Sequence, residues 1–455
     1  MFVYKIEGIF INVKRIFRIV LSVILITGGC DCGKSTTNAE DEDENIRENI
    51  EEGFDGLFDL NETENSVDFY PDEISGENEQ DLLDLESDIL DTHEDENSTF
   101  VYPPNLRGPF YAGVRTLREY FSDYSKWLDI MIWYPALAPP PGTQPYKYMW
   151  ILQGNAYENQ PVDPYPAPHP IILFSHGNKG INFQSFTLTE HLASHGFIVA
   201  APNHPGNTLF DNPSDEEIAR IALERPYDIA FTYDKVVALN RNPSDIFYGK
   251  VDESAVGMLG HSFGGYTTLM IAGATINVDN AKERCASGEI DSTFCNYINV
   301  WPAGEIVSRP PTMWIVKAAV PLAPGGYQAF YDDGLANVDV PVMIFGGTLD
   351  EWCTLEDEIR PIYNALPSPA YKIEIEGAGH MSFTDICRIP GSILIPELAQ
   401  MCDPSVYIDL DRAFEITNTF TTAFFRYYIE NEEGMSPYLS PDFASTCPEI
   451  DFAIK

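Results

Sequence analysis

The stretch Gly260-His261-Ser262-Phe263-Gly264-Gly265 decides the fold that this sequence predicts. An apolar run, 255–259, precedes it and a helix-forming run, 266–273, follows it, so the pattern is a strand, a sharp turn and a helix. A serine at such a turn has a strained backbone, and its neighbours can carry almost no side chain. The glycines around the serine meet that demand, and the first N–H groups of the new helix favour negative charge beside it. The stretch therefore predicts a nucleophile elbow with Ser262 as the nucleophile.

The residues that would activate Ser262 follow it in the chain. A serine needs a base that takes its proton and a carboxylate that orients the base. His380 is the only histidine after Ser262, and it lies in a glycine-rich loop behind the last predicted parallel strand. Asp350 lies a few residues past the end of the preceding strand, and its neighbour Glu351 is the alternative. Serine, aspartate, histidine is the chain order typical of this elbow, so we predict that Ser262, Asp350 and His380 are catalytic.

Acyl transfer also needs two preorganised N–H donors for the oxyanion. The residue after the nucleophile, Phe263, supplies one of them. The second is expected in the loop after an earlier strand, and the segment Phe174-Ser175-His176-Gly177-Asn178 ends such a strand. We therefore predict that the backbone of Asn178 is the second donor. His176, His204 and His261 do not follow the serine in the required order, and we predict structural roles for them.

From about residue 100 the sequence alternates between strand and helix signals. Several predicted strands are continuous apolar runs, as strands buried on both faces are. The alternation indicates an α/β fold with a mostly parallel central sheet and helices on both faces. The predicted strands are 129–134, 171–174, 197–201, 256–259, 318–322, 340–345 and 371–375, and the predicted helices are 184–194, 226–240, 265–274, 355–365 and 408–430. Residues 276–312 interrupt the pattern after the nucleophile helix, and we predict an insert there that serves as a lid or pocket wall over the carboxyl ends of the strands.

The negative charge of the chain is concentrated near its N-terminus. The formal net charge is −43 at pH 7, and residues 40–97 hold 25 Asp and Glu against one Arg, a net of 1 − 25 = −24. Dense charge with few apolar clusters predicts an acidic, disordered linker over residues 30–97. The remaining residues are still acidic, and such a surface repels nucleic-acid phosphates and anionic membranes. We therefore expect no nucleic-acid partner.

The first 30 residues have the pattern of an export signal. Basic residues at 14–18 precede the apolar run 19–26 and small residues before Cys30, which predicts a signal peptide over 1–29. Small residues before a cysteine resemble the bacterial lipobox, so we predict lipid attachment at Cys30, a cell-envelope location and membrane contact through this anchor only. An uncleaved membrane helix is the alternative, although the apolar run is shorter than the roughly 20 residues that a bilayer requires. Residues 28–35 also fit a phosphate-binding loop, but the acidic stretch behind them would repel phosphates.

Several motifs are similar to the α/β-hydrolase superfamily, and within it to dienelactone-hydrolase-like and platelet-activating-factor-acetylhydrolase-like proteins, bacterial lipoproteins included. The matching pieces are Trp133-Tyr134-Pro135, Phe174-Ser175-His176-Gly177, Asn203-His204-Pro205-Gly206, Arg225-Pro226-Tyr227-Asp228, the elbow itself and Gly377-Ala378-Gly379-His380. They occur in family order over about residues 105–430. The resemblance implies an α/β-hydrolase domain over 98–455 and a Ser–Asp–His esterase that needs no metal and no cofactor. Dienelactone hydrolases proper carry cysteine at the elbow, so the serine here argues against their substrate.

Six cysteines lie in the predicted hydrolase domain, and an even number in an exported domain favours disulfides. One pair would close a short loop in the insert, a second would join the loops that follow the predicted acid and base, and the third would hold the C-terminal tail. The predicted pairs are Cys285 with Cys295, Cys353 with Cys387, and Cys402 with Cys447. Reduced, buried thiols are the alternative.

The sequence thus predicts an exported serine hydrolase that cleaves carboxylic esters through an acyl-enzyme. The expected substrate is a small-molecule or lipid ester, such as a short-chain acyl ester or the acetyl ester of a phospholipid. A polyester or cutin-type hydrolase is the alternative within the same chemistry. A non-catalytic binding module on the same fold and a related peptidase are alternatives from other classes.

Overall fold

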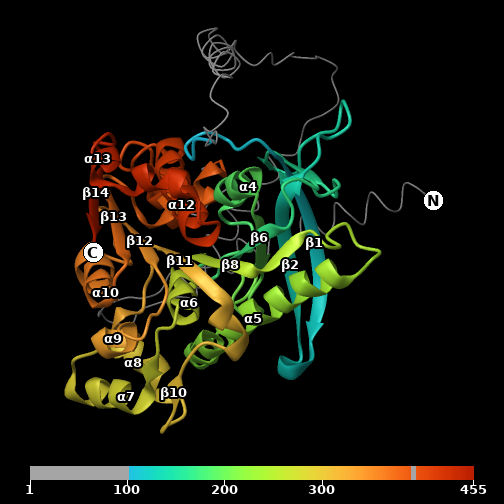
Figure 1. Ribbon diagram of the computed structural model, residues 1–455. Coiled ribbons are helices and arrows are strands. Elements are labelled where there is room, and N and C mark those ends of the chain that lie inside the picture. Colours follow the sequence, from blue (N-terminus) through green and yellow to red (C-terminus); the bar gives the residue numbers. More distant parts are fainter. Residues whose placement is uncertain (1–101, 391–395) are drawn as a thin grey trace, which may run out of the picture. The chain divides into compact units, whose positions relative to one another are not determined.

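The computed structural model describes residues 102–390 and 396–455, so the predicted signal peptide, Cys30 and the acidic linker lie outside the described residues. The central element is a 10-stranded sheet with the order β14-β13-β12-β11-β8-β6-β7-β2-β1-β5 (Figure 1). Its strands are β1 (Tyr111–Phe121), β2 (Lys126–Ala136), β5 (Ala156–Glu158), β6 (His169–Ser175), β7 (Ile198–Pro202), β8 (Val251–His261), β11 (Val316–Leu322), β12 (Val342–Gly347), β13 (Ala370–Ile375) and β14 (Ile450–Ile454). Two small ribbons are formed by β3 (Lys147–Tyr148) with β4 (Leu152–Gln153), and by β9 (Ile276–Asn277) with β10 (Ile306–Val307).

The helices connect these strands. They are α4 (Phe186–Ser194), α5 (Asp215–Arg241), α6 (Phe263–Ile271), α7 (Val278–Ser287), α8 (Ser292–Val300), α9 (Tyr327–Leu335), α10 (Arg360–Ala365), α11 (Pro396–Met401), α12 (Leu410–Ile429) and α13 (Pro441–Ala444). A π-helical turn, η3 (Leu355–Ile359), leads into α10, and short 3-10 turns include η4 (His380–Phe383). Among the described residues, no helix combines the length and the apolar character needed to cross a membrane.

The middle of the sheet is parallel, as the apolar runs predicted. Strands β7, β6, β8, β11, β12 and β13 pair in parallel, whereas β2 pairs antiparallel with β7, and β14 antiparallel with β13. Every residue of β6, β12 and β13 is buried. The predicted α/β-hydrolase architecture is confirmed. Because the central strands are parallel, their carboxyl ends meet at one edge of the sheet, where ligand sites of such sheets form.

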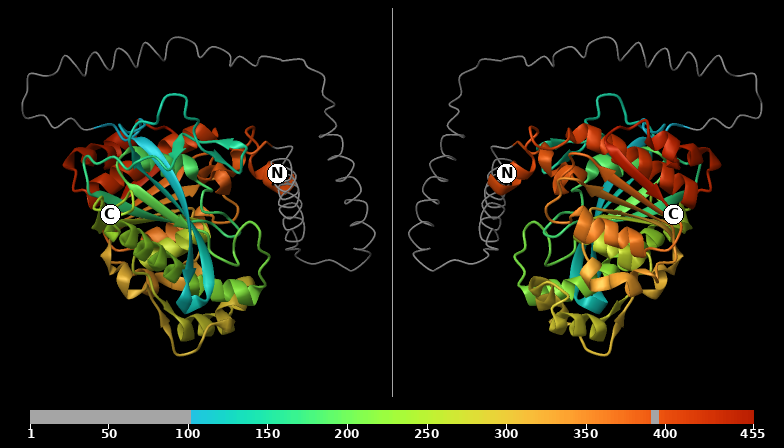
Figure 2. Two further views of the ribbon diagram at one scale, coloured as in Figure 1. Left: turned by 90° about the vertical axis from the view of Figure 1, so that its right-hand side faces the viewer. Right: turned by 90° about the vertical axis from the view of Figure 1, so that its left-hand side faces the viewer.

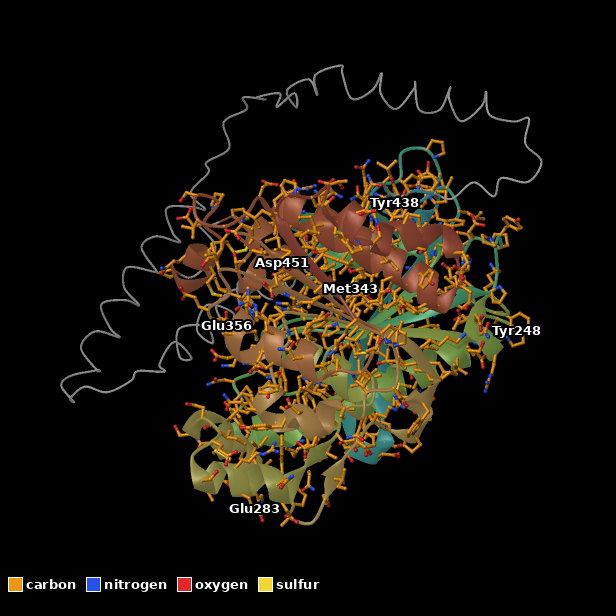
Figure 3. The ribbon with its side chains drawn as sticks, turned by 60° about the vertical axis from the view of Figure 1, so that its left-hand side comes forward. Tyr248, Glu283, Met343, Glu356, Tyr438 and Asp451 are labelled. Atoms are coloured by element: carbon orange, nitrogen blue, oxygen red, sulfur yellow. A yellow bond between two sulfur atoms is a disulfide. The ribbon has the colours of Figure 1, made fainter. Side chains whose placement is uncertain are left out.

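Helices cover both faces of the sheet and create two apolar cores. Residues of α5, α6 and α10 contribute to one core, and residues of α4 and α12 contribute to the other. Figure 1 shows α4 and α12 on one side of the strands and α6 with α10 on the other. In Figure 3, Met343 of β12 lies inside, between these layers, whereas Tyr248 and Glu283 lie at the periphery. Burial on both faces explains why the central strands are apolar throughout.

Among the elements that differ from the prediction, β1 and α5 do so for a local reason. Strand β1 was not predicted, because its second half alternates half-buried and exposed positions and carries charged side chains. Helix α5 begins at Asp215, 11 residues before the predicted start, because 226 − 215 = 11. Ser214 and Glu217 form a capping box at this end, and Pro226 lies inside the helix, where a proline normally indicates a helix start or break.

The predicted insert forms α7, α8 and the β9–β10 ribbon. It lies against the helix layer: Trp301 Nε1 donates to Ala219 O of α5 at 2.7 Å, and Tyr331 of α9 donates to Glu289 O. Figures 1 and 2 show α7 and α8 on the side of the sheet away from α12. The insert therefore extends the layer of α5, α6 and α9, and its role as a lid stays a prediction.

Two disulfides are present within residues 102–390 and 396–455, and only one of them is as predicted. Cys285 and Cys295 are joined in the insert, with Cα atoms 5.6 Å apart. Cys387 pairs with Cys402, with Cα atoms 5.1 Å apart, whereas Cys353 and Cys447 are free thiols. The predicted pairs Cys353–Cys387 and Cys402–Cys447 are therefore wrong. Spacing along the chain does not determine which loops come together, and the side chain of Cys353 is buried beside Ser262 instead.

Candidate active site

Ser262 has the strained backbone that a nucleophile elbow requires. It lies between β8 and α6 with φ 57° and ψ −117°, a conformation that costs free energy in a residue with a side chain. A Cβ on Gly264 would lie 1.8 Å from Ser175 O, and a Cβ on Gly260 would lie 2.3 Å from Gly264 O. Only glycine fits at these two positions, which explains the Gly-x-Ser-x-Gly pattern.

Asp350 and His380 meet in the loops after β12 and β13. His380 Nδ1 lies 2.7 Å from Asp350 Oδ2, and both side chains are almost completely buried. Asp350 Oδ1 accepts the backbone N–H groups of Trp352 and Cys353, each at 2.8 Å. A carboxylate accepts the proton of Nδ1, so Nε2 is the basic nitrogen of the ring. Glu351 is exposed, and the geometry favours Asp350 as the partner of the histidine.

Further contacts connect this pair with Ser262. His261, directly before the serine, donates from Nε2 to His380 O at 2.9 Å, and the two imidazole rings have centroids 4.7 Å apart. Burial raises the pKa of the Cys353 thiol well above its usual value, and a hydrogen bond with Ser262 offsets this only in part. The structure therefore gathers the three predicted catalytic residues at the carboxyl ends of β8, β12 and β13. Their catalytic roles stay a prediction.

The loop after β6 lies directly beside the serine. A Cβ built on Gly177 would lie 3.4 Å from Ser262 Cβ. The N–H of Gly177 donates to Gln184 Oε1 at 3.1 Å, and Gln184 Nε2 donates to His261 Nδ1 at 3.1 Å. His261 thus accepts at Nδ1 and donates from Nε2 to His380 O. One chain of hydrogen bonds therefore links the loop after β6 to the loop that carries His380, the predicted base.

The two predicted oxyanion donors flank this position. Asn178 follows Gly177 and is exposed, and its Oδ1 accepts from Asn207 Nδ2 at 2.7 Å. Phe263 is the first residue of α6, so its N–H belongs to the group that has no acceptor within the helix. Both residues therefore adjoin the segments that meet at the serine, and their role as oxyanion donors stays a prediction.

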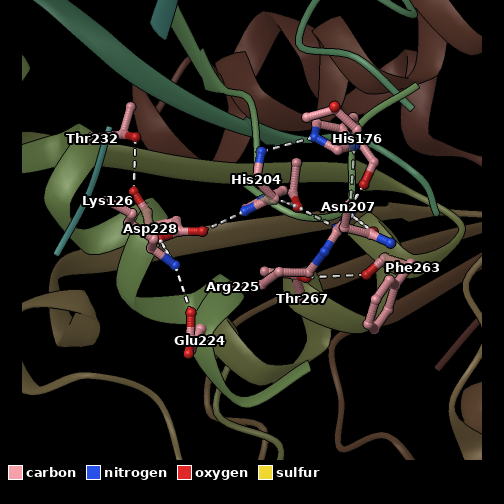
Figure 4. A network of polar contacts seen from close by, with 12 residues as sticks. Lys126, His176, His204, Asn207, Glu224, Arg225, Asp228, Thr232, Phe263 and Thr267 are labelled. Carbon is pink, nitrogen blue, oxygen red and sulfur yellow. Dashed lines mark hydrogen bonds and ion pairs between the residues drawn. The ribbon is translucent and has the colours of Figure 1, made fainter. Parts of the chain in front are cut away.

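A second Ser–His–Asp set is buried behind the loop. Ser175 Oγ lies 2.8 Å from His204 Nε2, and His204 Nδ1 lies 3.0 Å from Asp228 Oδ2 (Figure 4). These three residues are at most 1% exposed, so no substrate reaches them. Burial lowers the pKa of His204 well below its usual value and raises the pKa of Asp228 to about 6. Across residues 102–390 and 396–455, neither this cluster nor any other group of three or more His, Cys, Asp or Glu residues is arranged to hold a metal ion.

Sequence reasoning missed three residues around the triad. Trp352 is 61% exposed, and its ring centroid lies 5.1 Å from that of His380, so an apolar side chain faces solvent beside the predicted base. Its position in the sequence, two residues after the predicted acid Asp350, could have identified Trp352 as a residue near the active site. Nothing in the local sequence identifies Gln184, and Cys353 was assigned to a disulfide. Tertiary contacts alone reveal the roles of these two side chains.

Comparisons with known proteins agree with this geometry. The family model of platelet-activating factor acetylhydrolase, isoform II, matches residues 147–211, which include the loop after β6 and α4. Platelet-activating factor acetylhydrolase of Cavia porcellus is 21% identical over 408 residues, which are 76% of this chain and 83% of that protein.

Bacterial cutinases are also similar. Cutinase est2 of Thermobifida alba is 26% identical over 213 residues, which are 46% of this chain and 52% of that protein. Cutinase 2 of Thermobifida cellulosilytica is 23% identical over 290 residues, 61% of this chain and 79% of that protein. The chain thus spans about half the length of the first cutinase and about four fifths of the second. Together with the elbow and the parallel sheet, these matches show that the chain has the α/β-hydrolase fold and is similar to platelet-activating factor acetylhydrolases.

Proposed function

We propose that this chain is a serine ester hydrolase in which Ser262 is the nucleophile. The observation that carries the proposal is the 2.7 Å contact between Asp350 Oδ2 and His380 Nδ1, in loops at the same sheet edge as the strained Ser262. A buried carboxylate on Nδ1 leaves Nε2 as a base, which is the arrangement that serine hydrolysis requires. The similarity to cutinases and to platelet-activating factor acetylhydrolase supports ester bonds as the substrate.

The reaction proceeds through an acyl-enzyme. Ser262 Oγ attacks the ester carbonyl carbon while His380 Nε2 takes the hydroxyl proton, and Asp350 stabilises the imidazolium that forms. The backbone N–H groups of Phe263 and Asn178 bind the negative oxygen of the tetrahedral intermediate. His380 then gives the proton to the leaving alcohol. A water molecule repeats the sequence on the acyl-enzyme, which releases the acid and restores the serine.

The surroundings of the site favour apolar esters. Trp352 and Leu349 are 61% and 41% exposed and lie beside the predicted base and acid. Exposed apolar side chains at an active site bind apolar groups of a substrate. Short-chain acyl esters or phospholipid acetyl esters are the proposed substrates. The exposed position of Trp352, together with the cutinase relatives, supports a polyester or cutin-type substrate as the second candidate.

Active-site labelling tests this proposal. A fluorophosphonate probe should label the wild-type chain at Ser262, and Ser262→Ala should not be labelled. Hydrolysis of p-nitrophenyl esters across acyl lengths, beside a solid polyester and matching peptide amides, then separates the two substrate classes from a peptidase. A folded wild-type protein without labelling or ester hydrolysis would refute the proposal and favour a binding module.

We also propose that the chain is exported and anchored through a lipid on Cys30. The basic, apolar and small residues before Cys30 support this, and the Cys285–Cys295 and Cys387–Cys402 disulfides fit an oxidising compartment. Growth of a bacterial host with an alkyne fatty acid should label the full chain, and Cys30→Ser should abolish the label. Equal labelling of both proteins, or of neither, contradicts the anchor.

A further inference from the structure

Arg225 is a buried cation beside the predicted oxyanion hole. It lies on α5 and has no exposed surface, and burial lowers the pKa of its guanidinium to about 9, so it is protonated at neutral pH. Nη1 donates to His176 O at 2.6 Å and to Ser175 Oγ at 3.2 Å. Nη2 donates to Gly177 O at 3.0 Å and to Asn207 Oδ1 at 2.9 Å (Figure 4). One side chain therefore binds several points of the loop after β6.

The contact with Gly177 O acts on the peptide group that carries a predicted oxyanion donor. The carbonyl of Gly177 and the N–H of Asn178 belong to the same peptide unit. A cation that binds the carbonyl oxygen draws electron density from the N–H end, because consecutive hydrogen bonds polarise one another. Inside a protein this effect is screened less than in water. The Asn178 N–H thereby becomes a stronger donor toward a negative oxygen.

Arg225 is also linked to the second donor residue. Its guanidinium carbon lies 4.3 Å from the ring centroid of Phe263, which is the distance of a cation–π contact. Asn207, which accepts from Arg225, donates in turn to Asn178 Oδ1 at 2.7 Å. One guanidinium group thus contacts Phe263 directly and is linked to Asn178 through Gly177 O and Asn207.

The charge of Arg225 is directed at dipoles rather than at a carboxylate. The oxygen atoms that accept from it are two main-chain carbonyls, a hydroxyl and an amide oxygen, all of them neutral, and Nη2 also lies 3.4 Å from His176 Nδ1. Asp228, three residues further along α5, binds Lys126 Nζ at 2.8 Å and His204 Nδ1 at 3.0 Å. A buried arginine with a purely structural role usually pairs directly with an acid. Arg309 is such a case, since it is 5% exposed and pairs with Asp339.

We propose that Arg225 is a positioning residue for ester hydrolysis, which fixes the two oxyanion donors and polarises the Gly177–Asn178 peptide toward the oxyanion. The inference rests on the proposed function, because it concerns the reaction at Ser262. The oxyanion forms only on the way to and from the tetrahedral intermediate. Loss of Arg225 should therefore lower kcat and leave KM nearly unchanged.

Two substitutions at Arg225 and one matched control test the proposal. Arg225→Met removes the charge and the hydrogen-bond donors. Arg225→Lys keeps the charge but replaces the planar guanidinium group, which donates to two carbonyls, with a single ammonium group. Arg309→Met is the control, because Arg309 is also buried, donates to a main-chain carbonyl at Ile271 O, and has its guanidinium carbon 3.9 Å from the ring centroid of Trp314. Rates are expressed per active site that fluorophosphonate labels, so that misfolded protein does not count.

The expected result is a parallel loss of rate and of transition-state affinity. Removing a complete oxyanion donor costs about 10²–10³ in kcat, so weakening a donor in Arg225→Met should cost roughly 10–100-fold. The inhibition constant of an alkylboronic acid, whose serine adduct is a tetrahedral anion, should rise by a similar factor, while KM changes less than about twofold. Arg225→Lys should show a smaller loss in both quantities, and Arg309→Met should lose stability but neither rate nor boronate affinity.

The failure of this inference is distinguishable from the failure of the proposed function. Wild-type protein that neither hydrolyses esters nor reacts with fluorophosphonate overturns both. Active wild type with unchanged kcat and boronate affinity in Arg225→Met overturns the inference alone. If Arg225→Met does not fold, Arg225→Lys decides: a joint fall of kcat and boronate affinity supports the inference, and unchanged values overturn it. Equal losses in Arg309→Met overturn it as well, because the effect is then not specific to the oxyanion hole.

Discussion

The hydrogen bond between Asp350 and His380 decides which ring nitrogen is available to Ser262. In Asp350→Asn the amide can donate to Nδ1, which favours the tautomer with the proton on Nε2 and removes the base. We expect kcat to fall by about 10⁴-fold, against about 10⁶-fold for Ser262→Ala. Steady-state kinetics on a p-nitrophenyl ester measures both changes. Glu351→Gln is the control and should retain activity, because Glu351 is exposed; a large loss there would reassign the acid.

The buried carboxyl group of Glu358 makes the stability of the folded protein depend on pH. It is 7% exposed, and burial raises the pKa of its carboxyl to about 7, although Oε2 accepts the N–H of Tyr327 at 2.8 Å. A raised folded-state pKa means that the folded protein binds the proton more tightly than the unfolded chain does. The stabilising contribution of Glu358 is therefore complete below about pH 4.5 and is lost as the pH rises through 7.

The substitution Glu358→Gln tests the predicted direction in which stability changes with pH. The neutral amide can still accept from Tyr327 N–H but cannot ionise, so the variant should gain stability relative to wild type as the pH rises from 5 to 8. The expected gain at pH 8 is on the order of 1 kcal/mol, measured by urea denaturation at each pH. A pH-independent difference between the two proteins would contradict the prediction.

At the scale of single elements, the start of α5 depends on its cap. Ser214 Oγ accepts the N–H of Glu217, and the Glu217 carboxylate accepts the N–H of Ser214 at 2.8 Å. Ser214→Ala should cost about 1 kcal/mol in the free energy of unfolding, because the first turn of α5 loses the side-chain acceptor for the N–H of Glu217. Denaturant unfolding measures this cost. Ser308→Ala, at an exposed position outside any helix, should be neutral; equal effects of both substitutions would refute the role of the cap.

The sequence predicted elements well where one pattern acted alone. Buried parallel strands such as β6 and β12 are continuous apolar runs, and the glycines of the elbow are required by contacts as close as 1.8 Å. In α5 and β1, two sequence patterns indicated different structures. Pro226 obscured the first part of α5, and the outward-facing charges of β1 obscured a strand whose partner, β2, was predicted. Local signals are therefore reliable only where burial and propensity agree.

At the scale of the whole molecule, the order of the triad could be predicted but its surroundings could not. The placement of Ser262, Asp350 and His380 follows from chain order, since each comes after the carboxyl end of a parallel strand, at one edge of the sheet. The Arg225 network joins α5 to the loop after β6 across 48 residues, and no local pattern encodes that contact. The cysteine pairs failed for the same reason, because pairing depends on which loops the fold brings together.

The cysteines offer a test of the whole described fold. Peptide mapping of the full chain without reductant should find Cys285 linked to Cys295 and Cys387 to Cys402. Iodoacetamide should label Cys447 in the native protein and spare Cys353, because burial hides the Cys353 thiol and raises its pKa. Both thiols should react after denaturation. A Cys353–Cys387 linkage would require the acid and base loops to be arranged differently, and it would therefore contradict the active-site geometry together with the disulfide assignment.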